Sequence, residues 1–158
     1  YDNLVMFGQL YHLGKKNSVL RANELLERFG LTEAGKRPIK TYSGGMRRRL
    51  DLAASLIVKP KVLFLDEPTT GLDPKARREM WQLIKTLNAR GITIVLTTHY
   101  LEEAEALCQR IAMLKQGKIV ALDTTANLLT RYGSVKKDGE GKTDLEDVFV
   151  NIMSGGAL

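Results

Sequence analysis

A short apolar run that ends in two acidic residues constrains the fold of this 158-residue chain more than any other feature. The run is Val62-Leu63-Phe64-Leu65, and Asp66 and Glu67 follow it at once. A continuous apolar stretch of this length is typical of a strand that is buried on both faces of a parallel sheet. The sequence therefore predicts an α/β fold whose two carboxylates lie at the carboxyl end of a buried strand, where open α/β sheets bind ligands.

The segments around this run support an α/β fold. Helical periodicity before residue 60 predicts helices near 2–11, 18–29 and 43–59. After the acidic pair, Asp73 and Pro74 are a cap and first-turn pair for a helix that ends at Gly91. A second strand is expected at 93–98, which makes one parallel strand-helix-strand unit.

The last third of the chain predicts smaller elements. We expect a helix near 101–107, a hairpin over 111–122 that turns at Gln116 and Gly117, and two short helices. A capping box of Thr143 with Glu146 is expected at the start of the last helix.

Composition excludes several classes of protein. Hydrophobic residues make up 44% of the chain and charged residues 27%, which excludes disordered, collagen-like and disulfide-framework proteins. The single cysteine, Cys108, cannot form an intrachain disulfide, and no stretch approaches the ~18 apolar residues of a membrane span. We therefore expect a cytosolic, non-spanning chain. Its net charge of +6 permits an anionic partner without identifying one, and its first residue, Tyr1, suggests a piece of a longer protein.

The acidic pair has the chemistry for phosphoryl transfer. Because successive strand residues point to opposite sides, one carboxylate can hold a divalent cation while the other orients or deprotonates a water molecule. The alternative is that Asp66 and Glu67 merely end a strand and face solvent.

A second candidate site is the segment Ser43-Gly44-Gly45, which opens a helix. Backbone N–H groups at a helix N-terminus bind anions when no side chain obstructs them. The alternative is a serine N-cap that is followed by a flexible hinge.

Taken together, these motifs resemble those of the nucleotide-binding subunit of ABC transporters. The matches follow the family's order: Ser43-Gly44-Gly45 for the signature motif, Asp66 and Glu67 for Walker B, Asp73 for the D-loop and His99 for the switch histidine. The segments 42–50 and 145–149 most resemble drug-resistance ATPases of the ABC-2 exporter group, and the resemblance covers nearly the whole chain.

The resemblance implies a partial P-loop NTPase (RecA-like) core with a mostly parallel sheet, together with an α-helical subdomain. It divides the chain into a helical signature subdomain over 1–60, the later half of the ATPase core over 61–122 and a helical extension over 123–158. By the same resemblance, the strand that carries Walker A lies between strands of this chain. We therefore expect a gap, a rearranged sheet or strand exchange between copies if the isolated chain folds.

The resemblance also implies a role for each site residue. Asp66 would hold Mg²⁺, Glu67 would be the general base or the residue that orients the attacking water, and His99 would contact the γ-phosphate and that water. Ser43, Gly44 and Gly45 would bind the γ-phosphate of ATP held by a second nucleotide-binding subunit in a head-to-tail dimer, with Asp73 at the interface. The implied partners are that subunit and transmembrane permease subunits, without nucleic acid, on the cytoplasmic face of the cell membrane.

Two departures from the family pattern affect this interpretation. Met46 stands where many members carry Gln, and no G-x-x-x-x-G-K-[ST] loop or Q-loop precedes the signature. The segment Gly139-Glu140-Gly141-Lys142-Thr143 is not a substitute, because Lys136 occupies the required glycine position and the segment follows Walker B. We therefore expect a carboxyl-terminal portion of an exporter ATPase that is inactive alone.

Two alternative functions stay open. The chain could be a non-catalytic module that docks on a membrane subunit or on a partner that supplies Walker A, or an ABC ATPase that acts without a transporter. The cluster Arg47–Arg49 does not favour nucleic acid, because three successive residues point in different directions on a helix. A solvated surface or a subunit contact is the expected role of these arginines.

Overall fold

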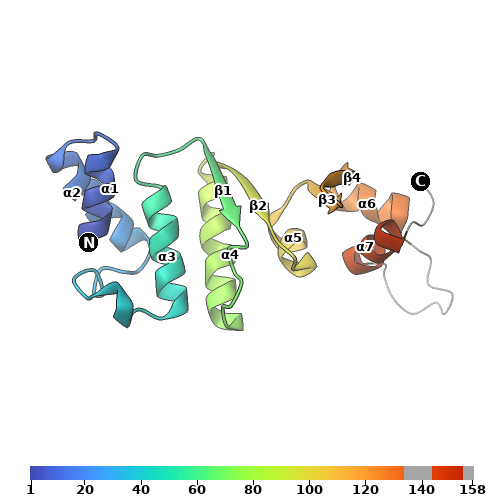
Figure 1. Ribbon diagram of the computed structural model, residues 1–158, viewed down its shortest axis with the longest axis horizontal. Coiled ribbons are helices and arrows are strands. Elements are labelled where there is room, and N and C mark those ends of the chain that lie inside the picture. Colours follow the sequence, from blue (N-terminus) through green and yellow to red (C-terminus); the bar gives the residue numbers. More distant parts are fainter. Residues whose placement is uncertain (134–143, 155–158) are drawn as a thin grey trace. The chain divides into compact units, whose positions relative to one another are not determined.

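The computed structural model describes residues 1–133 and 144–154, which belong to two compact units, 1–97 and 98–158 (Figure 1). The first unit contains α1 (Asp2–Leu10), α2 (Lys15–Arg28), the 3-10 turn η1 (Ile39–Thr41), α3 (Gly44–Ser55), β1 (Val62–Asp66), α4 (Pro74–Ala89) and β2 (Thr93–Thr97). The second contains α5 (Leu101–Leu107), β3 (Ile111–Lys115), β4 (Lys118–Asp123), α6 (Thr125–Tyr132) and α7 (Leu145–Ser154).

The helices of the first unit begin where their capping residues predict. Ser43 caps α3, because its Oγ accepts a hydrogen bond from the Met46 N–H at 3.2 Å. Asp73 caps α4, and Pro74 occupies the first helical position. Two helices differ from their expected ranges. α2 begins at Lys15 rather than Ser18, because Gly14, with a φ of 75°, is its N-cap, and α3 ends at Ser55 rather than near residue 59.

The sheet of the first unit is a parallel pair. β1 and β2 are in register from Val62 opposite Thr93 to Asp66 opposite Thr97. The prediction that β1 is buried on both faces is wrong: Leu63 is 5% exposed, but Phe64 on the opposite face is 75% exposed. The described residues cover only the face to which Leu63 belongs, so the other face of this apolar strand meets solvent.

The second unit is built around an antiparallel hairpin of β3 and β4. Its turn lies at Gln116 and Gly117, as predicted, and both residues have positive φ, of 50° and 74°. Residues from all five elements form its core: Ala104, Ile111, Met113, Ala121, Leu128, Leu145 and Val148.

The cap of α7 lies one residue later than predicted. Thr143 falls outside the described residues, and the reciprocal bonds are made by Asp144 and Asp147. The Asp147 N–H donates to Asp144 Oδ1 at 3.0 Å, and the Asp144 N–H donates to Asp147 Oδ2 at 3.4 Å. This is the geometry of a capping box, with Asp replacing both Thr and Glu.

The described strands form two separate two-stranded sheets, one in each unit, and the expected gap, rearrangement or exchange of strands stays a prediction. The parallel pair with its crossover helix makes the fold α/β, as the apolar run predicts. Among the described residues, no helix is long and apolar enough to cross a bilayer.

Candidate functional site

The neighbouring strand orients the carboxylate of Asp66. Asp66 is the last residue of β1 and lies on the exposed face of the sheet. Its partner in the parallel register is Thr97, whose hydroxyl donates a hydrogen bond to Asp66 Oδ1. One carboxylate oxygen is therefore held by the sheet itself.

Glu67 has an unusual backbone conformation. Its φ of 43° lies in the left-handed region, which costs a residue with a side chain about 1–3 kcal/mol. A hydrogen bond to β2 stabilises this conformation, because the Glu67 N–H donates to the Thr97 carbonyl at 3.0 Å. The side chain is also held, because Thr70 Oγ1 donates to Glu67 Oε2 at 3.1 Å.

The guanidinium of Arg48 reaches the same segment from α3. Its Nη2 donates to the carbonyls of Asp66 and Glu67 at 2.6 and 2.8 Å, and its Nε donates to the carbonyl of Pro68 at 2.9 Å. The expectation that the arginine cluster is a solvated surface or a subunit contact is thus wrong for Arg48. Its donors are used within the unit because the N-terminal turns of α3 lie beside the end of β1.

The helix N-terminus at Gly44 and Gly45 packs against the segment that leads into α4. A Cβ added at Gly45 would lie 3.2 Å from the Cβ of Ala76, whereas one added at Gly44 would meet only Leu72 Cδ2, at 3.9 Å. Gly45 therefore permits the close approach of α3 to α4, which run alongside each other in Figure 1. Gly44 stays exposed at the positive end of the helix.

A cavity of about 430 Å³ brings these two motifs together. Gly44 lines it from α3, and Asp66 and Glu67 line it from the end of β1. The turn before α4 adds Thr70, Gly71 and Leu72 to the lining, and the cavity is open to solvent. Carboxylates thus meet the N-terminal end of a helix within one cavity, so the lining offers ligands for a hard cation beside an anion-binding group.

The donor set of this cavity fits a magnesium-phosphate pair better than a metal ion alone. Mg²⁺ takes six oxygen ligands and usually keeps several waters and substrate oxygens. The described part of the chain contains no group of three or more His, Cys, Asp or Glu residues that could hold a metal. Asp66 and Glu67 would therefore leave most of the ligands to water and phosphate, the coordination Mg²⁺ prefers in nucleotide sites.

Asp73 lies on the same turn, at the start of α4. One of its oxygens, Oδ1, accepts the N–H groups of Lys75 and Ala76, both at 3.0 Å. These hydrogen bonds, that from Ala76 first, lower the pKa of its carboxyl below the ordinary value, because they favour the ionised form. The helix-cap reading of Asp73 is confirmed, and an interface role is compatible with its exposed position.

His99 belongs to the second unit and is described there on its own. Its exposed ring lies 4.1 Å from that of Tyr100, measured between centroids, with the planes at 40°. The structure thus assembles Gly44, Asp66 and Glu67 in one cavity and adds Ser43 and Asp73 as the caps of the helices beside it. The role of His99 at the γ-phosphate stays a prediction.

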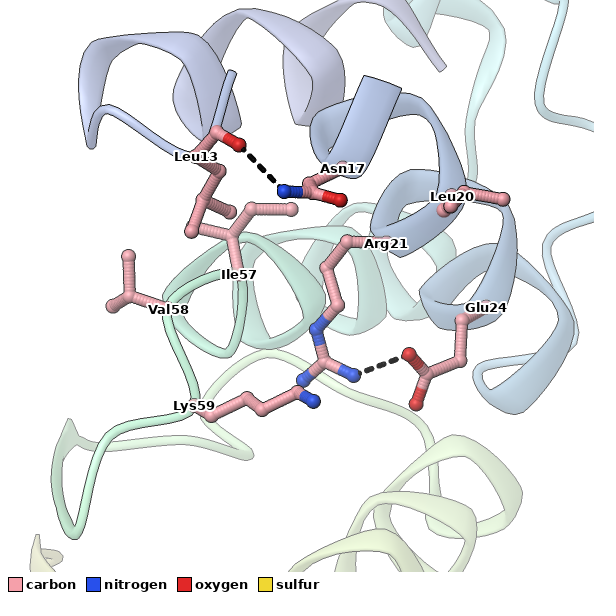
Figure 2. A pocket seen from close by; sticks show the side chains of 8 residues that line it. All are labelled: Leu13, Asn17, Leu20, Arg21, Glu24, Ile57, Val58 and Lys59. Carbon is pink, nitrogen blue, oxygen red and sulfur yellow. Dashed lines mark hydrogen bonds and ion pairs between the residues drawn. The ribbon is translucent and has the colours of Figure 1, made fainter. Parts of the chain in front are cut away.

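A second cavity, of about 370 Å³, lies among the helices of the first unit (Figure 2). Its buried cation is Arg21, whose Nη2 donates to the Leu56 carbonyl at 2.8 Å and whose Nη1 pairs with Glu24 at 2.6 Å. The hydrogen bond from Arg21 is the main cause that lowers the pKa of Glu24. Because these contacts join α2 to the end of α3, we assign Arg21 a structural role.

Thr70 and Thr97 were not among the candidate residues of the sequence, and Arg48 was expected to have a different role. Thr97 lies within the strand expected at 93–98, but the register that pairs it with Asp66 is decided by the sheet. The contact of Arg48 likewise depends on how α3 packs beside β1.

The chain is similar to several known proteins. Residues 7–103, more than half of the chain, match the family model described as "AAA domain, putative AbiEii toxin, Type IV TA system". Over 132 residues, the chain is 58% identical to the daunorubicin resistance ATP-binding protein DrrA2 of Streptomyces coeruleorubidus, which covers 84% of this chain and 41% of that protein. It is 53% identical over 157 residues to the doxorubicin resistance ATP-binding protein DrrA of Mycobacterium tuberculosis, covering 99% of this chain and 47% of that protein.

The fold comparison points the same way. A solved structure described as the ATP binding subunit of an ABC transporter matches with a TM-score of 0.75 at 24% identity, over 96% of this chain and 60% of that chain. At this identity the match supports the fold alone. The chain spans less than half the length of the two curated relatives.

Proposed function

We propose that this chain, which belongs to the drug-resistance ATP-binding proteins of the ABC transporter family, supplies the Walker B and signature parts of an ATPase that powers drug or small-molecule export. The observation that carries the proposal is the cavity in which Gly44 lies with Asp66 and Glu67. The names of the two relatives, resistance ATP-binding proteins for daunorubicin and doxorubicin, support export as the purpose.

The proposed chemistry divides the acidic pair. Asp66, oriented by the Thr97 hydroxyl, would bind Mg²⁺, chiefly through water. Bound Mg²⁺ would neutralise charge on the phosphates. Glu67, held by Thr70, would orient and deprotonate the attacking water, a step that typically contributes ~10²- to 10⁴-fold to rate. His99 would contact the γ-phosphate and the same water.

The signature residues would act on a second nucleotide. Ser43, Gly44 and Gly45 would bind the γ-phosphate of ATP held by the second subunit of a head-to-tail dimer, where α3 presents its positive end. Asp73 would lie at that interface and connect the two sites. The proposed partners are this second nucleotide-binding subunit and transmembrane permease subunits, at the cytoplasmic face of the membrane.

The 158 residues contain no G-x-x-x-x-G-K-[ST] loop, so we propose that the chain alone does not hydrolyse ATP. Without that loop, the triphosphate has no cradle of backbone N–H groups and no phosphate-binding lysine.

The test compares the isolated chain with the polypeptide encoded by the complete reading frame that contains it. We expect the complete product to hydrolyse ATP and Glu67→Gln to lower kcat by roughly 10²- to 10⁴-fold while ATP binding is retained. Glu33→Gln, at an exposed position outside the site, is the matched control and should keep the original kcat. A Glu67→Gln protein that turns over normally would refute the assigned role, and Glu67-dependent hydrolysis by the isolated chain would refute its inactivity.

A further inference from the structure

Arg48 contacts the turn that carries Glu67, and the proposed function assigns no role to this contact. This turn, residues 66–70, is called the glutamate turn below. Arg48 is half-buried on α3, one helical turn after Gly44. Its guanidinium donates to the carbonyls of three consecutive residues of the glutamate turn, Asp66, Glu67 and Pro68, at 2.6–2.9 Å.

Three successive carbonyls that approach the same point repel one another unless a cation or several donors lie between them. The left-handed φ of Glu67 folds the backbone into this arrangement. A guanidinium is suited to hold it, because its donors are fixed in one plane and its charge persists at any physiological pH. A lysine at position 48 would offer three donors from one nitrogen, without the planar spread of the guanidinium.

Glu67 is also held by Thr97 and Thr70. Its N–H is held by the Thr97 carbonyl at 3.0 Å and its side chain by the Thr70 hydroxyl at 3.1 Å. Thr70 also closes the turn, because its N–H donates to the Glu67 carbonyl at 3.2 Å. Arg48 donates to that same carbonyl, so removing its guanidinium loosens the bond that places the Thr70 hydroxyl beside the Glu67 carboxylate.

We propose that Arg48 is a positioning residue that holds the glutamate turn in its left-handed conformation and thereby sets the direction of the Glu67 carboxylate. The proposal rests on the proposed function for its catalytic meaning, but its geometry can be tested without nucleotide. Through Arg48, α3, which begins with the signature residues, is also hydrogen-bonded to the backbone of the acidic pair.

The test measures amide hydrogen exchange and the Glu67 carboxyl ¹³C shift by NMR in the 158-residue chain. In Arg48→Met we expect exchange at the Glu67 and Thr70 amides to accelerate at least about tenfold, with amides inside α4 unchanged. The carboxyl shift of Glu67 should move toward that of the exposed Glu33, because the Thr70 hydrogen bond is lost. Arg48→Lys should change the exchange rates and the carboxyl shift in the same direction, but by less than Arg48→Met does.

Arg47→Met is the matched control. Arg47 lines the same cavity and carries the same charge, but its guanidinium donates to the Lys40 carbonyl at 3.2 Å and not to the glutamate turn. In Arg47→Met, we expect the amide exchange rates and the Glu67 carboxyl shift to equal those of the unmodified chain. If Arg47→Met reproduces the changes, charge rather than hydrogen bonding is responsible and the proposal is wrong.

Two further results would overturn the proposal. One is unchanged exchange and an unchanged Glu67 shift in Arg48→Met; the other is equal acceleration across α4, which would indicate global destabilisation. Should Arg48→Met fail to fold, Arg48→Lys carries the same test with smaller expected changes. Since no ATP is needed, a positive result stands even if Glu67→Gln leaves ATP turnover intact, which separates this proposal from the proposed function.

Discussion

Asp73 shows how one side chain can serve two purposes. Its Oδ1 caps α4 by accepting two N–H groups, which uses one carboxylate oxygen and leaves the residue exposed at the start of the helix. A structural role therefore does not compete with the proposed role at a subunit interface, because the cap needs only one oxygen.

The cap predicts a pH dependence of stability. The folded pKa of Asp73 lies below its ordinary value of 3.8, so the stability that the ionised cap contributes is complete above that value. It is lost as pH falls through the lowered folded pKa. Asp73→Asn keeps a capping oxygen but cannot ionise, so its Tm deficit relative to the unmodified chain should be constant near neutral pH and should shrink in acid.

Thermal unfolding followed by circular dichroism between pH 7 and pH 2 measures this difference. Asp73→Ala removes the cap at every pH and should have a lower Tm than Asp73→Asn near neutrality. A Tm deficit of Asp73→Asn that stays the same down to pH 2 would show that the charge of Asp73 does not contribute.

Among single residues, the candidate site was predictable where local chemistry decides the outcome. Ser43 and Asp73 cap helices as their sequence context predicts, because capping involves only the next three residues. The left-handed φ of Glu67 was not predictable, since it depends on contacts with Thr97 and Arg48, which are distant in sequence.

At the scale of elements, the close approach of α3 to α4 distinguishes the two glycines at the start of α3. A Cβ on Gly45 would lie 3.2 Å from the Cβ of Ala76 in α4, whereas Gly44 lies one residue earlier, in more open space. The two glycines are therefore not equivalent, although both belong to the same motif.

Valine substitutions should separate these two positions. In Gly45→Val, the new Cβ would lie about 3.2 Å from the Cβ of Ala76, and two methyl groups would be added beside it. We therefore expect Gly45→Val to lower the free energy of unfolding by about 1–3 kcal/mol more than Gly44→Val does. Urea denaturation of both variants measures this. The two share the cost of a β-branched residue in the first turn of α3, so equal destabilisation would contradict the packing role of Gly45.

At the scale of the whole molecule, the exposed face of the β1–β2 sheet is the most unusual feature. Val62 and Phe64 from β1 and Val95 from β2 are all exposed on it, and Phe64 and Val95 are directly opposite in the register. Apolar strands with a solvent-facing side favour association with other chains.

We therefore expect the 158-residue chain to self-associate through this face. Phe64→Lys should shift the molar mass measured by size-exclusion chromatography with light scattering toward that of a monomer. Leu20→Lys is the matched control, because it replaces an exposed leucine on α2 and leaves the sheet untouched. A stable monomer of the unmodified chain would contradict the prediction, as would equal effects of the two variants.

The sequence alone determined the class of fold and the order of the elements, because local rules decide both: an apolar run forms a strand, and Ser43 and Asp73 start helices. The family was indicated by the resemblance of the ordered motifs, not by these rules. It also identified the acidic pair, since the end of a strand is a local property.

Only the tertiary structure decided which residues surround that pair and which strand face is covered. Arg48 contacts the glutamate turn because α3 packs beside it, and Phe64 is exposed because the described residues supply no layer over its face. Both outcomes depend on contacts between segments far apart in the chain. Apolar periodicity indicates that a face can be buried, but the presence of a packing partner decides whether it is.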